Sequence, residues 1–243
     1  MIFPTEFISQ DLITSASELN LREEMKVTYH PYSDDWGYWT IGNVFKNFDD
    51  YVLLSSMFPG TPIYEPETKS NWFHKQYILS AQIQHYLQLL DDFNTQFVQK
   101  GILTLYHTSW ANVFRPEKDH SYLVPKRITY PHTDSSLENN AVVSSIWLNE
   151  EDNGGTSFWS WKGRQVAPVS TYDEYETYMY SVIGNELIPF TNHDTHGDWV
   201  KLAESPCSYG TIVVYTGAQY HSPTITDHSR TRWSHLIAGH PWS

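Results

Sequence analysis

The sequence predicts a mainly β fold with helices in its N-terminal part. Residues 71–99 place apolar side chains at alternating steps of three and four residues, the period of an amphipathic helix. After Gly101 the pattern changes to short apolar runs rich in β-branched and aromatic residues, which is typical of strands. With 243 residues, 40% of them hydrophobic, the chain is long enough to bury one full core.

The N-terminal elements follow in chain order. Residues 1–24 are polar and irregular, and no element is predicted there. Strand-like runs follow at 27–29 and 38–41, and the pair Asp49-Asp50 is suited to cap a short helix that Pro59-Gly60 ends. Beyond Gly101 the predicted strands are 102–106, 141–143, 146–148, 211–215 and 232–236.

A segment at 162–208 is expected to interrupt these strands as an insertion or lid. Its aromatic stretch 171–180 suggests a short helix, and both a substrate lid and aromatic surface packing of a long loop remain open. No linker divides the chain, so we expect one domain over 1–243. Residues 1–101 would form a helical and mixed support, and 102–240 the β core.

The tryptophans around the turn expected at 149–155 are interpreted as core or rim packing rather than as a peptide-binding groove. These are Trp147, Trp159 and Trp161.

Charge and cysteine content exclude several classes of function. The chain has 15 Lys+Arg against 28 Asp+Glu, a net charge of −13, which argues against unassisted binding to nucleic acid or anionic membrane. Its one cysteine, Cys207, rules out an intrachain disulfide and four-cysteine zinc sites. The start lacks a signal-peptide pattern, and no apolar run approaches the roughly 18 residues of a spanning helix. We therefore expect a cytoplasmic protein.

Twelve histidines invite a search for metal ligands, and a His-x-Asp motif stands at 132–134. On an extended chain, His132 and Asp134 point to the same face, so one strand end can present both to a metal ion. An imidazole and a carboxylate suit Fe(II), but a third ligand must come from elsewhere. Taken alone, the motif is as consistent with a polar turn. His221, which follows the strand at 211–215 and a turn at Gly217, is the candidate third ligand.

A second His-x-Asp motif, His196 to Asp198, lies in the polar run 192–198. We interpret this run as a solvated loop, because a motif outside its structural context is a poor predictor. The competing hypothesis is a metal-dependent hydrolase that uses His193, Asp194, His196 and Asp198. That hypothesis predicts that His132→Ala spares metal binding.

A third motif is the run Ser-Arg-Thr-Arg-Trp-Ser at 229–234. On a strand, Arg230, Arg232 and Ser234 would share one face. If that face is buried, an arginine fork and a hydroxyl can hold a carboxylate through charge-assisted hydrogen bonds. The alternative is an exposed edge strand whose arginines discourage pairing with another chain.

The order of these motifs resembles the Fe(II)/2-oxoglutarate-dependent oxygenase superfamily. In chain order they are His-x-Asp, Gly-Gly-Thr-x-Phe at 154–158, a strand and turn, His221, and Arg-x-Ser. The resemblance covers residues 102–240 and is greatest to the prolyl-hydroxylase-like branch and to uncharacterised microbial and phage members. Weaker similarity extends to 41–48, and the segment 122–136 also resembles the uncharacterised members.

The resemblance implies a double-stranded β-helix, a jelly roll like that of cupins, with iron inside its mouth. It also implies that His132, Asp134 and His221 are the metal ligands, a 2-His-1-carboxylate triad with open coordination positions.

For the cosubstrate, the resemblance implies that Arg232 pairs with the distal carboxylate of 2-oxoglutarate and that Ser234 supports it. Arg230 is the alternative basic residue. Asn112 and Tyr130 are further candidates for contact with the cosubstrate, although Tyr130 is equally consistent with simple packing.

The implied activity is that of an Fe(II)- and 2-oxoglutarate-dependent dioxygenase. Such an enzyme would use O2 to hydroxylate an unknown small-molecule or peptide substrate, with release of succinate and CO2. Asp134 favours hydroxylation or a related oxidation, because halogenating relatives replace this carboxylate. The alternative is a non-catalytic metal-binding β-barrel module, which would have no need of a carboxylate clamp. Serine hydrolysis has little support, since the chain has no Gly-x-Ser-x-Gly elbow.

Overall fold

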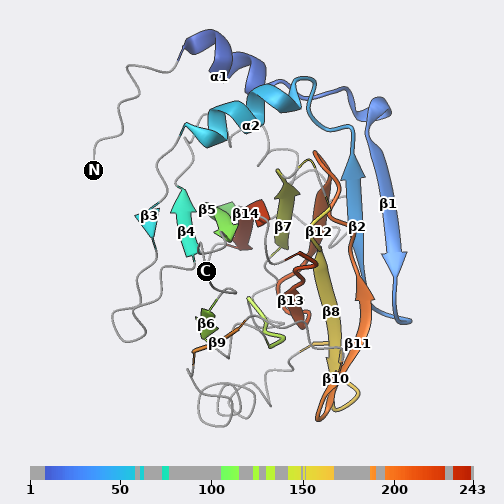
Figure 1. The fold of residues 1–243 in the computed structure, drawn as a ribbon. Helices are drawn as coiled ribbons and strands as arrows, with labels where there is room; N and C mark the ends of the chain where they lie inside the picture. The colour runs from blue at the N-terminus through green and yellow to red at the C-terminus, as the bar shows by residue number, and fades with distance from the viewer. Residues whose placement is uncertain are drawn as a thin grey trace.

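In the part of the chain that it describes, a computed structural model has three antiparallel β-sheets and two α-helices (Figure 1). It describes residues 9–57, 61–62, 73–76, 105–114, 123–125, 130–134, 142–148, 150, 152–166, 187–189, 195–227 and 232–241. The helices are α1 (Gln10–Ser17) and α2 (Phe48–Ser56), with a short 3-10 helix at Arg22–Glu24. The strands are β1 (Lys26–Pro31), β2 (Gly37–Gly42), β3 (Thr61–Pro62), β4 (Phe73–Gln76), β5 (Leu105–Phe114), β6 (Leu123–Pro125), β7 (Val142–Trp147), β8 (Thr156–Trp161), β9 (Leu187–Pro189), β10 (Thr195–His196), β11 (Trp199–Glu204), β12 (Ile212–Thr216), β13 (His221–Pro223) and β14 (Arg232–Pro241).

The larger sheet joins strands from both halves of the chain. Its order is β1-β2-β12-β7-β14-β5-β4-β3, so the N-terminal hairpin β1–β2 extends the C-terminal strands directly. The smaller sheet has the order β10-β11-β8-β13, and β6 pairs with β9 in a separate two-stranded sheet. The chain is therefore mostly β, as predicted, and the described part of residues 1–101 contributes strands as well as helices.

Alternate residues of the central strands serve two different cores. On β12, Ile212 and Val214 pack into one cluster with helix residues such as Leu54, whereas Val213 and Tyr215 pack into another. The first cluster lies between the larger sheet and the helices, which sit at the top of the view in Figure 1. The second lies on the opposite face, where strand β8 of the smaller sheet contributes to it. Because side chains alternate between the two faces of a strand, every second residue of these strands faces the same core.

The N-terminal segment contains a helix that the sequence did not predict. Ser9 caps α1, because its hydroxyl accepts a hydrogen bond from the amide of Leu12 at 3.1 Å. Ala16 is fully buried against the helix-side core, and Ser15 donates a hydrogen bond to Asp50 of α2. The helix is only eight residues long, so its apolar pattern is too brief to detect in a polar stretch. The short helix predicted at Asp49-Asp50 is present as α2, but these residues do not cap it: the N-cap is Asn47, and Asp49 and Asp50 lie in the first turn.

Two further expectations need correction. The long helix predicted over 71–99 is wrong at 73–76, which form strand β4 paired with β5; the rest of that range lies outside the described residues. Tertiary strand pairing here overrides the local period. The segment 162–208 does not simply interrupt the strands either. Its residues 195–204 form β10 and β11, and β11 pairs with β8. The helix suggested at 171–180 lies outside the described residues.

Strand β8 is buried along its whole length. All six of its residues are buried, and Trp159 and Trp161 are among them. Trp147 is also buried, so the interpretation of the three tryptophans as packing residues is confirmed. A strand that is buried on both faces shows no alternation of polar and apolar residues, which explains why the sequence did not reveal β8.

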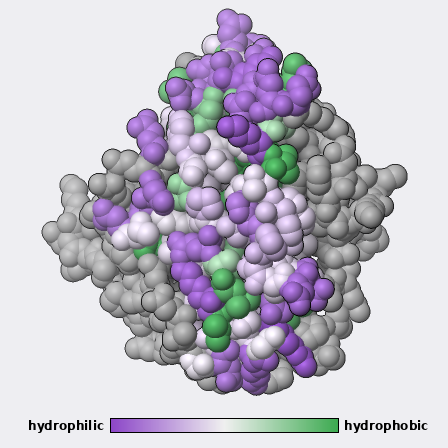
Figure 2. Space-filling view, turned by 90° about the vertical axis from the view of Figure 1, so that its right-hand side faces the viewer, coloured by the Kyte–Doolittle hydropathy of each residue, from purple (hydrophilic) through white to green (hydrophobic). Residues whose placement is uncertain are grey.

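The outer strand β1 is mostly exposed. Viewed from that side, the described surface is largely hydrophilic, with small separate apolar patches (Figure 2). Val27, Tyr29 and Val200 are among the exposed large apolar residues. In the described part of the chain, no helix has the length and apolar character needed to cross a membrane.

Gly155 is a position where the fold should not tolerate a side chain. A methyl group there would overlap the carbonyl oxygen of Ser205. We predict that Gly155→Ala lowers the free energy of unfolding by about 1–3 kcal/mol, measured by urea denaturation. In the control Gly42→Ala, the added atom meets only Cβ of Lys26 at 3.9 Å, so a change of about 0.5 kcal/mol or less is expected. Equal effects of the two substitutions would contradict this account.

Candidate metal centre

Backbone hydrogen bonds bring the two distant parts of the predicted triad together. The amide of His132 donates to the carbonyl of His221 at 2.8 Å, and the amide of His221 donates back at 2.9 Å. The amide of Asp134 donates to the carbonyl of Gly217, also at 2.8 Å. On its other edge His221 pairs with Phe158 of β8, so the segment 130–134 continues the smaller sheet beyond β13. Residues 89 positions apart in sequence are thereby fixed side by side.

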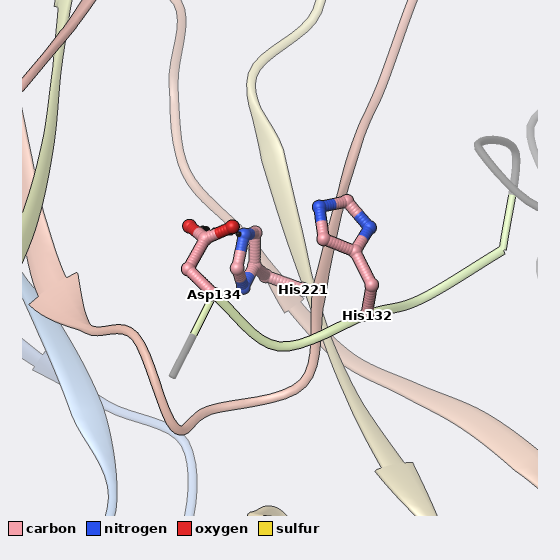
Figure 3. A group of neighbouring side chains, drawn as sticks. All are labelled: His132, Asp134 and His221. Carbon is pink, nitrogen blue, oxygen red and sulfur yellow. Dashed lines mark ion pairs between the residues drawn. The ribbon is translucent and has the colours of Figure 1, made fainter. Parts of the chain in front are cut away.

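The three predicted ligands converge on one point (Figure 3). One ligand atom from each of His132, Asp134 and His221 lies within 4.8 Å of the others. The Nε2 atom of His221 is 3.2 Å from Oδ2 of Asp134, and the two imidazole rings are 4.6 Å apart between centroids. His221 is buried, His132 is half-buried and Asp134 is the most exposed of the three. Among the described residues, no other group of histidine, cysteine and carboxylate side chains is arranged to hold a metal ion.

Both histidines are oriented by a backbone carbonyl two residues earlier. Nδ1 of His221 lies 2.9 Å from the carbonyl oxygen of Gln219, and Nδ1 of His132 lies 3.3 Å from that of Tyr130. A carbonyl only accepts hydrogen bonds, so each Nδ1 carries the proton and each Nε2 keeps its lone pair. In proteins, a hydrogen bond that holds the proton on one ring nitrogen of a histidine orients the other nitrogen to ligate a metal ion.

The charges of the three groups are strongly coupled. Burial, and after it the neighbouring His221, lower the pKa of His132 to about 4, against the opposing effects of Asp134 and the Tyr130 carbonyl. Burial lowers the pKa of His221, but the charge of Asp134, its hydrogen bond to the ring and the hydrogen bond to the Gln219 carbonyl together outweigh burial and raise this pKa above the ordinary 6.5. Without a metal, the position between His221 and Asp134 therefore favours a proton. A cation bound there would take the place of that proton.

The Arg-x-Ser motif lies on a buried face, as one of its two sequence interpretations required. Arg232 and Ser234 are 4% and 2% exposed, so the exposed edge strand is excluded for β14. The guanidinium of Arg232 lies over the ring of Trp147, 4.6 Å from its centroid, and its Nη2 donates to the carbonyl of Gly155 at 3.1 Å. Trp233, between them in sequence, packs into the helix-side core. Arg232 and Ser234 therefore share the face of the larger sheet that carries Trp147.

Two residues that the sequence analysis did not single out support the site. Tyr215 is 2% exposed, and its ring centroid is 4.7 Å from that of His221. Burial raises the pKa of Tyr215 well above 10, and Asp134 raises it further, while Arg232 and a hydrogen bond with Ser145 lower it. Tyr215 thus lies within electrostatic reach of both the triad and Arg232. The sequence did contain one signal for Tyr215. It lies two residues after Val213 on the same strand, so both side chains face the same side of the sheet.

The second is Gln219, which fixes the turn that leads into β13. Its side-chain oxygen accepts from the amide of Thr216 at 3.2 Å, and its side-chain nitrogen donates to the carbonyl of Gly37 at 2.7 Å. The backbone carbonyl of the same residue orients His221. No pattern in the sequence distinguishes this glutamine from other polar turn residues.

The remaining candidates are Tyr130, Asn112 and Arg230. Tyr130 is buried, and the contact it makes with His132 runs through its carbonyl. Asn112 on β5 pairs in register with Ser234. Arg230 lies outside the described residues.

Only part of the motif used by the competing hydrolase hypothesis lies within the described residues. His196 ends β10 and Asp198 is exposed in the turn to β11, so the described part of the expected solvated loop forms a tight hairpin with a solvated turn. His193 and Asp194 lie outside the described residues.

The chain matches a family model over residues 80–234, and its description is "Family of unknown function (DUF6445)". No curated protein matches the sequence significantly.

Two solved structures, of a protein that depends on 2-oxoglutarate (α-ketoglutarate) and of one that has it bound, have a similar fold. The non-heme α-ketoglutarate-dependent epimerase SnoN from nogalamycin biosynthesis is 12% identical, with a TM-score of 0.52 over 95% of this chain and 83% of that one. HygX from Streptomyces hygroscopicus, solved with nickel and 2-oxoglutarate, is 11% identical, with a TM-score of 0.50 over 84% of this chain and 82% of that one. A prolyl-4-hydroxylase from Pseudomonas putida has a TM-score of 0.39 at 14% identity, over 76% of this chain and 78% of that one. That score does not assign the chain to the prolyl-hydroxylase-like branch.

The lowered pKa of His132 predicts an acid-sensitive site in the metal-free protein. The unfolded pKa is near 6.5 and the folded one about 4. Between them the unfolded chain binds this proton more readily, so the free energy of unfolding falls as pH decreases. His132 should contribute a loss of about 2 kcal/mol between pH 7 and pH 5. Urea denaturation with a chelator present measures this loss, and His132→Gln should remove it. An unchanged pH dependence in that variant would contradict the assignment.

Proposed function

Because the chain belongs to the DUF6445 family, a family of unknown function, we infer its activity from the residues of its site. We propose that it is an Fe(II)- and 2-oxoglutarate-dependent oxygenase. The observation that carries this proposal is the convergence of His132, Asp134 and His221 with both Nε2 atoms available. The double-stranded β-helix, with the whole chain 1–243 as one oxygenase domain, belongs to the same proposal. The fold shared with SnoN and HygX supports it.

The donor set fits Fe(II). Two neutral imidazoles and one carboxylate form the facial triad of non-heme iron oxygenases, which leaves positions open for a cosubstrate and O2. The tautomers set by Gln219 and Tyr130 satisfy the requirement that each histidine ligate through Nε2. Aspartate at position 134 supplies a negative charge that partly balances the cation.

The cosubstrate would extend from the metal toward Arg232. A guanidinium offers a planar fork of donors that matches a carboxylate, and burial strengthens such a bond. Ser234, two residues further on the same face, would add a hydroxyl. Arg230, Asn112 and Tyr130 remain proposed contacts, with Arg230 the alternative to Arg232.

When bound, iron with 2-oxoglutarate would use O2 to couple oxidative decarboxylation of the cosubstrate to succinate and CO2 with oxidation of a substrate. The protein's part here is to orient the ligands, hold the cosubstrate carboxylate and keep the reacting centre away from bulk water. We propose hydroxylation of a small molecule or peptide, with Asp134 retaining the carboxylate that hydroxylation uses. The segment 162–208, apart from its strands β9, β10 and β11, stays a proposed lid over that substrate, with aromatic surface packing as the alternative.

Anaerobic titration tests the site directly. Addition of Fe(II) and then 2-oxoglutarate to the purified protein should produce a visible metal-to-cosubstrate charge-transfer band. We predict that Asp134→Ala and His221→Ala abolish the band, because two ligands cannot hold the ion in the required geometry. The matched control is Asp198→Ala, which removes the exposed aspartate of the second His-x-Asp motif and should leave the band intact.

Each other outcome has a definite meaning. Iron binding without a band would favour the non-catalytic metal-binding module. Loss of iron in Asp198→Ala but not in Asp134→Ala would favour the hydrolase hypothesis. No iron binding in the unaltered protein would overturn the metal centre itself.

The carboxylate clamp can be tested separately from the metal. Arg232→Met keeps much of the side-chain volume over Trp147 but removes the charged fork. We predict that Fe(II) affinity stays within about threefold, while the dissociation constant for 2-oxoglutarate rises by about 10-fold to 100-fold, as for loss of a hydrogen bond to a charged group. The titration of the band with 2-oxoglutarate measures both steps. An unchanged 2-oxoglutarate affinity would transfer the role to Arg230.

A further inference from the structure

We propose that the Tyr215 hydroxyl, held in place by Ser145, donates a hydrogen bond to the 2-oxoglutarate that lies between the triad and Arg232. This inference rests on the proposed function and assigns a new residue to the same site. Tyr215 would be a cosubstrate-binding residue, and Ser145 a positioning residue that acts through it.

The position of Tyr215 is fixed by packing on several sides. Its ring lies against His221 at 4.7 Å and meets Phe158 edge-on, 5.3 Å between centroids with the planes at 80°. It pairs in register with Val143 of β7 and is 2% exposed. A side chain held in this way has little freedom, so its hydroxyl occupies one defined place beside a metal ligand.

The inner face of β7 connects Tyr215 with Arg232. Val143 pairs with Tyr215, Ser145 bonds its hydroxyl, and Trp147 carries the Arg232 guanidinium over its ring at 4.6 Å. These three β7 residues are spaced by two, so they lie on the same face of the strand. A dicarboxylate that reaches from the triad to Arg232 would run along this face and pass the Tyr215 hydroxyl.

Tyr215 and Ser145 share a hydrogen bond, and each hydroxyl can both donate and accept. A carboxylate oxygen can only accept, so a carboxylate beside Tyr215 would take the phenol proton in a hydrogen bond. Ser145 would then donate to the phenol oxygen and hold it in place. An anionic oxygen is the acceptor that gives the strongest such bond.

Substitution by phenylalanine isolates the hydroxyl. Tyr215→Phe keeps the ring against His221 and Phe158, so Fe(II) affinity should stay within about threefold. The dissociation constant for 2-oxoglutarate, read from the charge-transfer band without O2, should rise by about 10-fold to 100-fold. The matched control is Tyr38→Phe. Tyr38 is buried in the same core as Tyr215, and its hydroxyl donates to the carbonyl of Glu204 at 3.2 Å, so its loss should leave 2-oxoglutarate affinity unchanged.

Ser145→Ala provides a second, independent variant. It should weaken 2-oxoglutarate binding by about threefold to tenfold, and the effect should vanish in the Tyr215→Phe background, because Ser145 acts only through Tyr215. Additive effects would overturn its positioning role. If the unaltered protein shows the band and Tyr215→Phe binds 2-oxoglutarate equally well, this inference fails and the proposed function stands. If the unaltered protein shows no band, the proposed function fails and this inference with it.

Discussion

The site depends on one reciprocal pair of backbone hydrogen bonds, between His132 and His221. These residues are far apart in sequence, and neither belongs to a long strand: β13 has three residues, and His132 forms an isolated bridge. Because backbone hydrogen bonds hold the two residues opposite each other, the relative position of the two imidazole rings does not depend on side-chain packing alone. The bond from Asp134 to Gly217 then fixes the third ligand to the turn that precedes β13. The metal centre is a consequence of sheet extension rather than of a dedicated loop.

The two faces of the larger sheet divide structural and chemical tasks. The helix-side face is apolar, and Ile146, Ile212 and Val214 on it bury their side chains against the helices. The opposite face combines aromatic rings with buried polar groups, among them Arg232 and Ser234. Buried polar groups destabilise a fold unless they are paired, so a core built only for stability would exclude them. Their concentration on the face that meets the triad is the expected mark of a binding site.

The sequence predicted the site better than it predicted the elements around it. The His-x-Asp motif and His221 were identifiable, because two-residue spacing on an extended chain and the order of motifs along the chain restrict the choices. The same two-residue spacing predicted that Arg232 and Ser234 face the same side of their strand. The helix expected at 73–76 failed, because pairing with β5 is a long-range interaction that local periodicity does not register. Tyr215 and Gln219 escaped notice because their roles arise from contacts with residues distant in sequence, such as Ser145 and Gly37.

The Gly-Gly turn before β8 links the fold to the clamp. Gly154 has a φ of +81°, and a side chain on it would overlap the carbonyl of Thr224, just as one on Gly155 would overlap that of Ser205. The carbonyl of Gly155 accepts both the amide of Thr224 at 3.0 Å and Nη2 of Arg232 at 3.1 Å. One carbonyl therefore ties the chain just beyond β13, the strand of His221, to the proposed cosubstrate arginine. Two glycines are needed where backbones pass this closely, so a change in this turn should disturb Arg232 as well as the sheet.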